Sequence, residues 1–248
     1  MNAPESSSGE GKAGLGDFAY PGQELAIFVH AKNWKAYWSS FLRPFLHQTV
    51  LEVGAGIGSN TVLLSTSRPQ RWVCLEPDGQ LRSELERNLK QLPAGCHETF
   101  SSTVAALPAT ELYDTIIYID VLEHIADDAA ELKRAANHLK PGGRLAVLSP
   151  AHQWLFSKFD AAIGHHRRYS RRRLLAVAPP GVRLERARYL DAFGLFLSLG
   201  NRLLLRQDLP SVGQIKFWDR FVVPVSRLMD PILFHRAGKS VLVIWQKV

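Results

Sequence analysis

The sequence predicts an α/β fold with a mostly parallel sheet and helices on both of its faces. Three observations lead to this prediction. Short apolar runs of strand length alternate with longer amphipathic runs of helical period. A glycine-rich turn, LEVGAGIGSN at 51–60, follows the first apolar run and precedes an amphipathic stretch. The 248 residues are 46% hydrophobic and 21% charged, values of a globular protein that exclude a wholly disordered chain.

The expected strands are short and apolar, and DTIIYID gives the strongest signal for a buried strand. In chain order they are residues 49–53, 71–76, 97–100, 114–120, 144–149, 182–190 and 240–247. The expected helices are amphipathic and cover residues 24–45 (one or two helices), 59–67, 78–92 and 127–140. Asp78 is a candidate helix cap, and Pro141-Gly142-Gly143 is expected to stop the last of these helices. Alternating strands and helices imply parallel neighbours covered on both faces.

Composition excludes several classes of protein. The two cysteines, Cys74 and Cys96, form neither a disulfide framework nor a CxxC metal pair. Residues 1–17 lack the apolar core of a signal peptide and are expected to be a flexible tail. No run reaches the roughly 18 apolar residues of a membrane span. We therefore expect one domain over residues 18–248 in a cytoplasmic protein, at most peripheral at the inner face of the membrane.

The net charge of +7 is concentrated in GHHRRYSRRRL at 164–174. Such a basic segment suits phosphate, an anionic membrane surface or nucleic acid, and a solvated arginine face is the alternative. Nucleic acid is the weaker interpretation because the arginines lie in one loop and no recognised nucleic-acid-binding module accompanies them.

The glycine turn lies where a strand ends and a helix begins, the position at which open α/β sheets bind ligands. Its spacing, Gly54-x-Gly56-x-Gly58, differs from the dinucleotide fingerprint, which would place the third small residue at Ser59. A phosphate loop would need a Gly-Lys-Ser/Thr ending, which is absent. Glu76, about 20 residues downstream at a strand end, can accept hydrogen bonds from ribose hydroxyls. Together these features favour a ligand with a nucleoside and no pyrophosphate. A tight connection without a ligand is the alternative.

Four segments in this order, LEVGAGIGSN, LEPD, YIDVLEHIADD and LKPGGRLAVLSP, resemble the class I S-adenosylmethionine-dependent methyltransferases. The resemblance is close over about residues 34–150. It implies a Rossmann-like, seven-stranded, mostly parallel sheet with a reversed last strand, and S-adenosylmethionine as the cofactor. It also implies a division into lid helices (24–46), a cofactor-binding core (49–150), an acceptor-site insertion with amphipathic helices (151–240) and the last strand (241–248).

The resemblance carries cofactor roles over to matching positions. These are Glu52, Gly54, Gly56, Gly58, Glu76, Pro77, Asp78, Asp120 and Trp34. Glu52 and the glycine backbone would hold the methionine part, and Glu76 would hold the ribose. Asp120 would lie near the methionine moiety or the transferred methyl, with helix capping as the alternative. Trp34 would belong to a lid, with core packing as the alternative.

One segment departs from the family pattern. Many relatives place an aspartate near the end of the third strand to bind the adenine amino group. This chain reads FSSTVAAL at 100–107. Ser102, Thr103 or a backbone carbonyl is therefore expected to contact adenine, while Pro77 and Asp78 would border the adenosine.

Methyl displacement at a sulfonium mainly requires the acceptor to be held in line with the methyl group. A general base helps when the acceptor is a hydroxyl or an amine. The candidate bases are His124, His152 and His165. His124 belongs to the LEH pattern found in relatives, and the alternative to a base role is a structural hydrogen bond. His152 directly follows the fifth expected strand. No metal site is expected.

The most distinctive segment, SPAHQWLFSKFDAAIGHHRRYSRRRL, follows the fifth expected strand, where class I methyltransferases often insert acceptor-binding elements. Its pattern, H-x-W…D…G-H-x-R-R-Y, is similar to a subgroup associated with cell-envelope glycan and lipid genes. Trp154, Asp160, Arg168 and Tyr169 are the predicted acceptor residues, because an arginine can pair bidentately with phosphate or carboxylate. The alternative is a structural loop in which Asp160 bridges to an arginine.

Residues 189–207 and 216–238 are amphipathic, and arginines interrupt their apolar faces. They could lie on an anionic membrane, line a substrate channel, form a homodimer seam or cap the sheet.

The sequence thus predicts methyl transfer to a small or amphipathic, anionic, lipid- or glycan-linked acceptor, with O-methylation favoured by the histidines. Two other classes stay open. An NAD-dependent oxidoreductase is opposed by the spacing at Gly58 and Ser59. The other is a non-catalytic binding relative.

Overall fold

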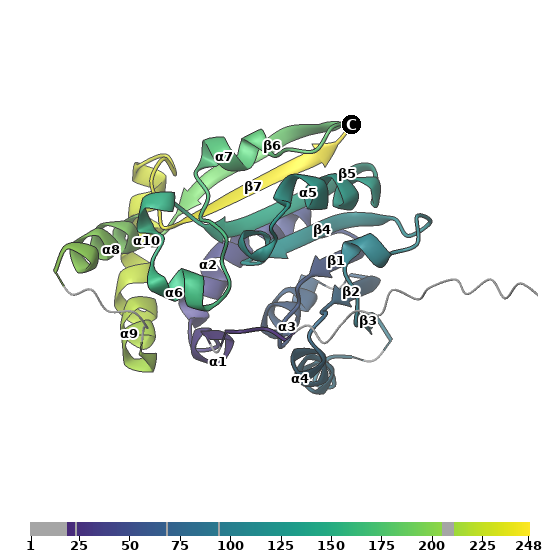
Figure 1. The fold of residues 1–248 in the computed structure, drawn as a ribbon, viewed down its shortest axis with the longest axis horizontal. Helices are drawn as coiled ribbons and strands as arrows, with labels where there is room; N and C mark the ends of the chain where they lie inside the picture. The colour runs from purple at the N-terminus through teal and green to yellow at the C-terminus, as the bar shows by residue number, and fades with distance from the viewer. Residues whose placement is uncertain (1–18, 23, 68, 94, 205–210) are drawn as a thin grey trace, which may run out of the picture.

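A seven-stranded sheet runs through the computed structural model, which describes residues 19–22, 24–67, 69–93, 95–204 and 211–248 (Figure 1). The predicted tail at 1–17 lies outside these residues. The strands are β1 (Thr49–Val53), β2 (Arg71–Leu75), β3 (His97–Phe100), β4 (Tyr113–Ile119), β5 (Leu139–Pro150), β6 (Val182–Leu190) and β7 (Ser240–Lys247). Their order is β3-β2-β1-β4-β5-β7-β6, and β7 is antiparallel to both neighbours. The predicted Rossmann-like sheet with a reversed last strand is confirmed.

The helices are mostly short. The longer elements are α1 (Glu24–Phe28), α2 (Lys32–Leu42), α3 (Ser59–Leu64), α4 (Gly79–Leu89), α5 (Asp128–Asn137), α6 (Lys158–Ala162), α7 (Arg171–Ala176), α8 (Ala192–Leu204), α9 (Val212–Phe217) and α10 (Val223–Ile232). The short 3-10 helices are η1 (Arg43–Phe45), η2 (Ser65–Ser67), η3 (Val104–Ala106), η4 (Leu122–His124) and η5 (Gln153–Leu155). A π-helix, η6 (Trp218–Val222), joins α9 to α10. Among the described residues, no helix has the length and apolar character needed to cross a membrane.

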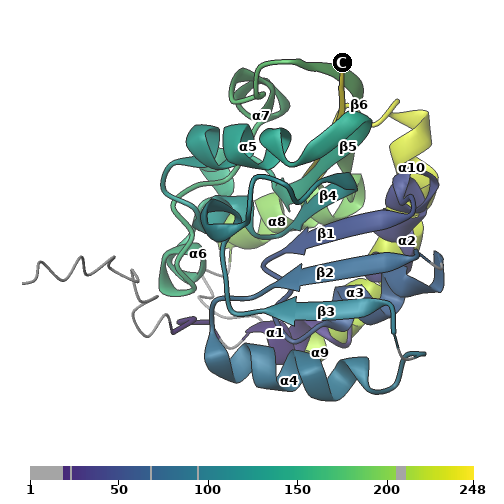
Figure 2. The same cartoon turned by 90° about the vertical axis from the view of Figure 1, so that its right-hand side faces the viewer.

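Both faces of the sheet are covered by helices, as the second view shows (Figure 2). Alternate residues of β4 face opposite sides, because successive strand side chains point in opposite directions. Ile117 and Ile119 join a core beneath α2, α3, α4 and α10. Ile116 and Tyr118 join a second core beneath α5 and α7. Burial on both faces explains why this strand reads as a continuous apolar run.

The fifth strand begins earlier than expected. Helix α5 ends at Asn137, and β5 already pairs with β4 at Leu139, so the prediction that Pro141-Gly142-Gly143 stops the helix was wrong. A Cβ at Gly143 would lie 2.8 Å from the Lys140 carbonyl oxygen and 3.2 Å from two carbonyl oxygens of the neighbouring strand. The glycine therefore permits a close backbone approach within the sheet rather than ending a helix.

The glycine turn after β1 needs glycine for two separate reasons. Gly54 and Gly58 have φ angles of 67° and 78°, which disfavour residues with a Cβ. A Cβ at Gly54 would also lie 2.7 Å from a Val121 methyl, and one at Gly58 would lie 2.5 Å from a Leu85 methyl. The turn therefore packs tightly against the loop after β4 and against α4.

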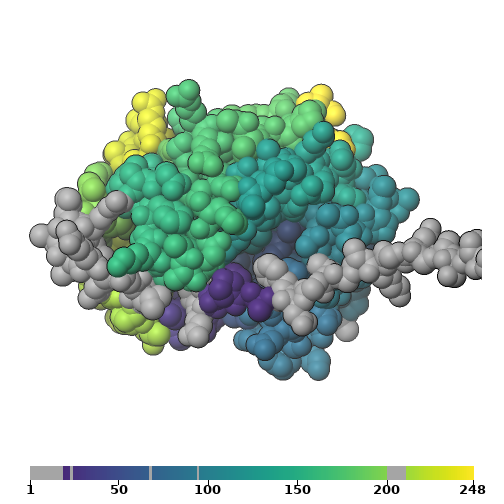
Figure 3. Space-filling view, in the orientation of Figure 1, coloured from purple at the N-terminus to yellow at the C-terminus, as the bar shows by residue number. Residues whose placement is uncertain are grey.

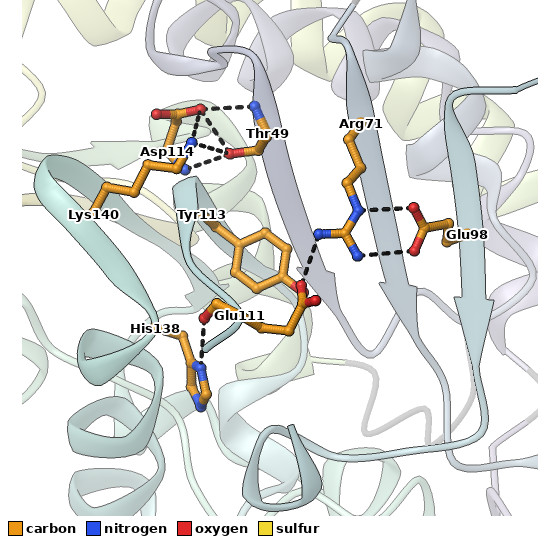
Figure 4. Close-up of polar contacts among 8 residues, drawn as sticks. All are labelled: Thr49, Arg71, Glu98, Glu111, Tyr113, Asp114, His138 and Lys140. Atoms are coloured by element: carbon orange, nitrogen blue, oxygen red, sulfur yellow. Dashed lines mark hydrogen bonds and ion pairs between the residues drawn. The ribbon is translucent and has the colours of Figure 1, made fainter. Parts of the chain in front are cut away.

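Polar contacts fix the amino-terminal ends of the strands (Figure 4). The Arg71 guanidinium donates to both Glu98 oxygens at 2.8 and 2.9 Å and to Glu111 at 2.7 Å. Asp114 accepts from Lys140 Nζ at 3.0 Å. These ion pairs occupy this edge of the sheet, and the opposite, carboxyl edge carries the glycine turn.

Carboxylates of the C-terminal helices hold α2 in place. Asp219 accepts hydrogen bonds from the backbone N–H groups of Asn33 and Trp34, at 3.0 and 2.8 Å, and so satisfies the free donors at the start of α2. The fully buried Asp230 accepts from the Tyr37 hydroxyl at 2.7 Å. Helix α2 is therefore positioned by residues nearly two hundred positions away in the sequence.

Candidate active site

A cavity of about 1380 Å³ opens at the carboxyl edge of the sheet. It is lined by the glycine turn and the ends of β2 and β4, by α1 and α2, and by the segment from η5 through α6 together with α8 and α9. In the space-filling view the α1 residues, in purple, lie across the surface between the green α6 segment and the blue α4 (Figure 3). Ligand pockets usually measure about 300–1,000 Å³, so this cavity has room for a cofactor and an acceptor together.

Most of the predicted cofactor residues meet on the cavity wall: Trp34, Gly54, Gly56, Glu76, Pro77, Ser102, Thr103 and Asp120. The Glu76 carboxylate accepts from the N–H groups of Gly56 and Asp78, at 2.7 and 3.0 Å. Burial raises the pKa of Glu76, and these two hydrogen bonds oppose the rise. Asp120 has a φ of 54°, an uncommon conformation for a non-glycine residue, at the point where β4 ends. The structure thus brings most of the residues predicted to bind the cofactor to one part of the cavity wall.

Three predicted cofactor residues lie behind the wall instead of on it. The Glu52 carboxylate is buried, accepts from the Thr61 hydroxyl at 2.7 Å and from the Trp72 indole at 2.9 Å, and has a pKa raised to about 7 by burial. Asp78 caps α4, as predicted, by accepting from the N–H groups of Gln80 and Leu81. Gly58 packs against α4. These three residues therefore pack behind the cavity wall and do not line the cavity.

Lys35 and Tyr20 are wall residues that sequence reasoning missed. Lys35 Nζ donates to Ser59 Oγ at 2.7 Å. Burial lowers its pKa, and the nearby charges of Asp120 and Glu52 oppose that shift. The Tyr20 N–H donates to Asp78 at 2.7 Å, and its ring lies 5.5 Å from that of His124.

A cluster of titratable side chains lies on the cavity wall, on the turn after β4 and in the loop after α6. His124 and His165 meet edge to face with ring centroids 4.5 Å apart, and both line the cavity. Burial, and then the charges of His165 and His166, lower the pKa of His124 to about 3, so its imidazole is neutral. The adjacent Glu123 is fully buried, and burial together with the Asp120 charge raises its pKa well above the usual range.

Asp160 is the centre of a buried ion-pair network. It accepts from Arg168 Nε and Nη2 at 2.8 and 3.0 Å, from the Ser157 N–H and hydroxyl at 2.8 Å each, and lies 3.0 Å from His165 Nδ1. Burial opposes ionisation, but the contacts from His165, Arg168 and Ser157 hold the pKa of Asp160 below its usual range. The structure thus contains the predicted bridge to an arginine, with Arg168 also on the cavity wall.

Three other residues of this insertion do not line the cavity. Tyr169 is fully buried in the core, and its hydroxyl donates to Asp128 at 2.7 Å. The His152 ring stacks on Tyr189 at 5.0 Å, and its Nε2 lies 3.0 Å from the Gly238 carbonyl oxygen. Trp154 is 46% exposed, with its ring 5.4 Å from that of His152. The geometry therefore does not support acceptor roles for Tyr169 and Trp154 or a base role for His152.

The remaining wall is mainly apolar. It includes Leu155, Phe156, Phe159, Ile163, Leu197, Ile215, Phe217 and Trp218. Two lysines interrupt this surface, Lys158 and Lys239. Lys239 Nζ lies 5.7 Å from the Trp218 ring centroid, and burial lowers its pKa. This half of the cavity therefore combines apolar walls with cationic side chains.

A family model described as a methyltransferase domain matches residues 30–193, which include strands β1 to β6. The chain belongs to this methyltransferase family. It is a class I enzyme that uses S-adenosylmethionine, which confirms the predicted family, activity and cofactor. The oxidoreductase and non-catalytic alternatives are thereby set aside. No curated protein matches the sequence.

Solved structures share the fold of this methyltransferase at low identity. Coclaurine N-methyltransferase bound to N-methylheliamine and SAH is 14% identical with a TM-score of 0.59, over 86% of this chain and 72% of its own. Mitomycin 7-O-methyltransferase is 18% identical with a TM-score of 0.57, over 90% and 55%. The cyclase SpnF is 11% identical with a TM-score of 0.59, over 91% and 94%. One fold thus serves different acceptors and reactions, so the acceptor must be argued from the site.

Proposed function

We propose that this methyltransferase transfers the methyl group of S-adenosylmethionine to a hydroxyl oxygen of an anionic, amphipathic acceptor, such as a lipid- or glycan-linked molecule. The observation that carries the proposal is the second half of the cavity. Its walls are apolar, while Lys158 and Lys239 supply positive charge. Apolar walls with a few charged groups suit a ligand that has both an apolar body and an acidic group.

The wall residues of the first half fit the cofactor. We assign the ribose hydroxyls to the Glu76 carboxylate and the methionine carboxylate to the Lys35 ammonium, with Asp120 beside the methionine amino group. Ser102 and Thr103 border the adenine. The absence of a side chain at Gly54 and Gly56 leaves the backbone open to close approach. The bound cofactor supplies a methyl group activated by a sulfonium, so the protein mainly has to position the acceptor.

The acceptor hydroxyl is assigned to the part of the wall near His124 and His165. His124 is neutral, so its imidazole can accept a hydrogen bond from a hydroxyl group. An ammonium acceptor would bring no lone pair for attack until deprotonated. O-methylation is therefore favoured over N-methylation.

The acceptor proposal predicts a preference for acidic substrates. Labelled S-adenosylmethionine is incubated with long-chain hydroxy acids and with their neutral amides, and mass spectrometry locates the added methyl group. We expect the acids to be preferred at least tenfold in kcat/KM. Lys239→Met should raise KM for the acids at least tenfold and leave the amides unaffected, because it removes a cation from an apolar wall. Exposed Lys133→Met on α5 is the control. Equal use of acids and amides, or methylation at nitrogen, would contradict the proposal.

An exposed apolar surface, here called the C-terminal apolar face, adjoins the mainly apolar half of the cavity. We assign that half to the acceptor and call it the acceptor half. It comprises Phe196, Leu197, Phe217, Phe221, Leu228, Ile232 and Phe234, which are 45–77% exposed. Leu197 and Phe217 also line the cavity, so this face and the acceptor half are continuous. Exposed cationic residues on the same helices and the turn after them are Lys216, Arg220, Arg227 and Arg236. This combination supports peripheral contact with an anionic lipid surface from which an amphipathic acceptor could enter.

Membrane contact predicts co-sedimentation with vesicles of phosphatidylglycerol and much weaker co-sedimentation with phosphatidylcholine. Leu228→Glu, at a position 73% exposed, should lower the bound fraction at least fivefold, because it places an anion on the apolar face. Leu112→Glu, at an exposed position before β4, is the matched control. If Leu228→Glu instead splits a dimer measured by light scattering, and vesicles do not bind the wild type, the face is a homodimer seam.

A further inference from the structure

Two segments far apart in the sequence bring three potential metal ligands together at the cavity wall. Glu123 and His124 lie in η4, directly after β4, and His165 lies in the loop after α6. One ligand atom from each of the three lies within 4.8 Å of the other two. No metal site was expected from the sequence, in which the two segments lie about forty residues apart.

The Glu123 carboxylate has one oxygen that its surroundings do not satisfy. Its Oε2 accepts from the Ser149 hydroxyl at 2.9 Å. Its Oε1 is buried and has no hydrogen-bond partner in the part of the chain that the structure describes. The His165 Nε2 atom lies 3.9 Å from it, which is too long for a hydrogen bond. A fully buried carboxylate oxygen without a partner is costly, and a cation bound at this part of the cavity wall would satisfy it.

The His165 imidazole is oriented as a metal-binding histidine usually is. Metal-binding histidines commonly donate their second ring N–H to a carboxylate or a backbone carbonyl. His165 Nδ1 lies 3.0 Å from Asp160 Oδ1, which leaves Nε2 as the nitrogen on the Glu123 side. Asp160 is itself held by the Arg168 guanidinium. His124 is hydrogen-bonded to the backbone of Gly164. The contact at Nδ1 thus fixes the His165 ring and leaves its Nε2 to bind a metal ion, and the Gly164 contact holds the His124 ring in place.

We propose that Glu123, His124 and His165 bind a divalent first-row transition metal ion, such as Mn²⁺ or Zn²⁺. Two imidazoles and one carboxylate suit such ions better than Mg²⁺ or Ca²⁺, which prefer oxygen ligands. Metal–ligand distances of about 2.0–2.2 Å require each ligand atom to move inward by less than about 1 Å.

The site has a direct use if the proposed O-methylation is correct, and this role rests on that proposal. Three protein ligands leave positions open for an acceptor oxygen, which would then bind the cation instead of donating its hydrogen bond to His124. A bound cation lowers the pKa of a coordinated hydroxyl, as it does for water. In the transfer, the acceptor O–H releases its proton to solvent, its oxygen forms the bond to the methyl carbon, and the carbon–sulfur bond electrons stay on the sulfur of neutral S-adenosylhomocysteine. No oxidant or reductant is needed.

The site is tested by metal binding, which requires no acceptor. Protein treated with EDTA and dialysed is titrated calorimetrically with Mn²⁺, Zn²⁺ and Mg²⁺. The wild type should bind one equivalent of Mn²⁺ or Zn²⁺, with Mg²⁺ at least tenfold weaker. Glu123→Gln and His165→Asn should each lose at least tenfold in affinity. His166→Asn, in the same loop but exposed, should bind like the wild type.

A second readout separates loss of the site from loss of the fold. Saturating metal should raise the Tm of the wild type but not of Glu123→Gln, because only a ligand of the native state stabilises it. The affinity of Glu123→Gln for S-adenosylhomocysteine should be unchanged. Absence of metal binding by the wild type, or equal binding by Glu123→Gln and His165→Asn, would overturn the proposal. Metal binding with methyl transfer unaffected by EDTA would keep the site and overturn its role in catalysis.

Discussion

Replacing Glu76 by alanine is expected to weaken S-adenosylhomocysteine binding about 100-fold, or ~2.7 kcal/mol. Glu76 is only 5% exposed, and its carboxylate lies on the cavity wall at the end of β2. Each hydrogen bond from a ribose hydroxyl to a carboxylate contributes about 1.5–3 kcal/mol. The same carboxylate also fixes the glycine turn through the Gly56 N–H. Alanine removes both effects, so the loss should lie near the upper end of this range.

The measurement is calorimetric titration of S-adenosylhomocysteine into the wild type, Glu76→Ala and Glu76→Gln. The amide keeps one acceptor oxygen, so Glu76→Gln should lose about tenfold, ~1.4 kcal/mol. Glu86→Ala, on the exposed surface of the neighbouring α4, should bind like the wild type. NAD serves as a ligand control and should not bind. A loss below threefold in Glu76→Ala would place the ribose elsewhere in the cavity.

The cofactor half could be predicted because its determinants are local in the sequence. The apolar runs predict buried parallel strands, since residues buried on both faces of a sheet read as continuous apolar segments. Gly54 and Gly58 reflect the backbone conformation of one turn. Asp78 caps the helix that begins beside it. Each of these signals lies within a few residues of the structure it specifies.

The acceptor half could not be predicted to the same extent, because its residues are oriented by distant contacts. Arg168 and Tyr169 both belong to a polar-looking stretch, but a β-bridge between Tyr169 and Ala151 sends Tyr169 into the core. Successive residues of extended chain point to opposite sides, which leaves Arg168 facing the cavity. Lys35 faces the cofactor half because Asp219, in the C-terminal helices, fixes where α2 begins.

Replacing Asp160 by asparagine is expected to lower the free energy of unfolding by about 3–5 kcal/mol, the usual cost of removing one partner from a buried ion pair. Asp160 is 0% exposed and neutralises the Arg168 guanidinium, which would otherwise keep an uncompensated charge at the cavity wall. Urea denaturation of the wild type and Asp160→Asn gives the difference. Asp127→Asn is the control, because asparagine caps α5 as well as aspartate does.

The double variant Asp160→Asn with Arg168→Met shows whether the ion pair itself is the cause. If the pair accounts for the loss, adding Arg168→Met to Asp160→Asn should cost little more, because the unpaired charge is removed. Additive losses would mean that Asp160 acts mainly through Ser157 and His165. Asp160 also orients His165, so the double variant should bind Mn²⁺ more weakly than the wild type even if the second substitution costs no further stability. Stability and metal affinity would then separate the two roles of one buried carboxylate, neutralising the arginine and orienting the histidine.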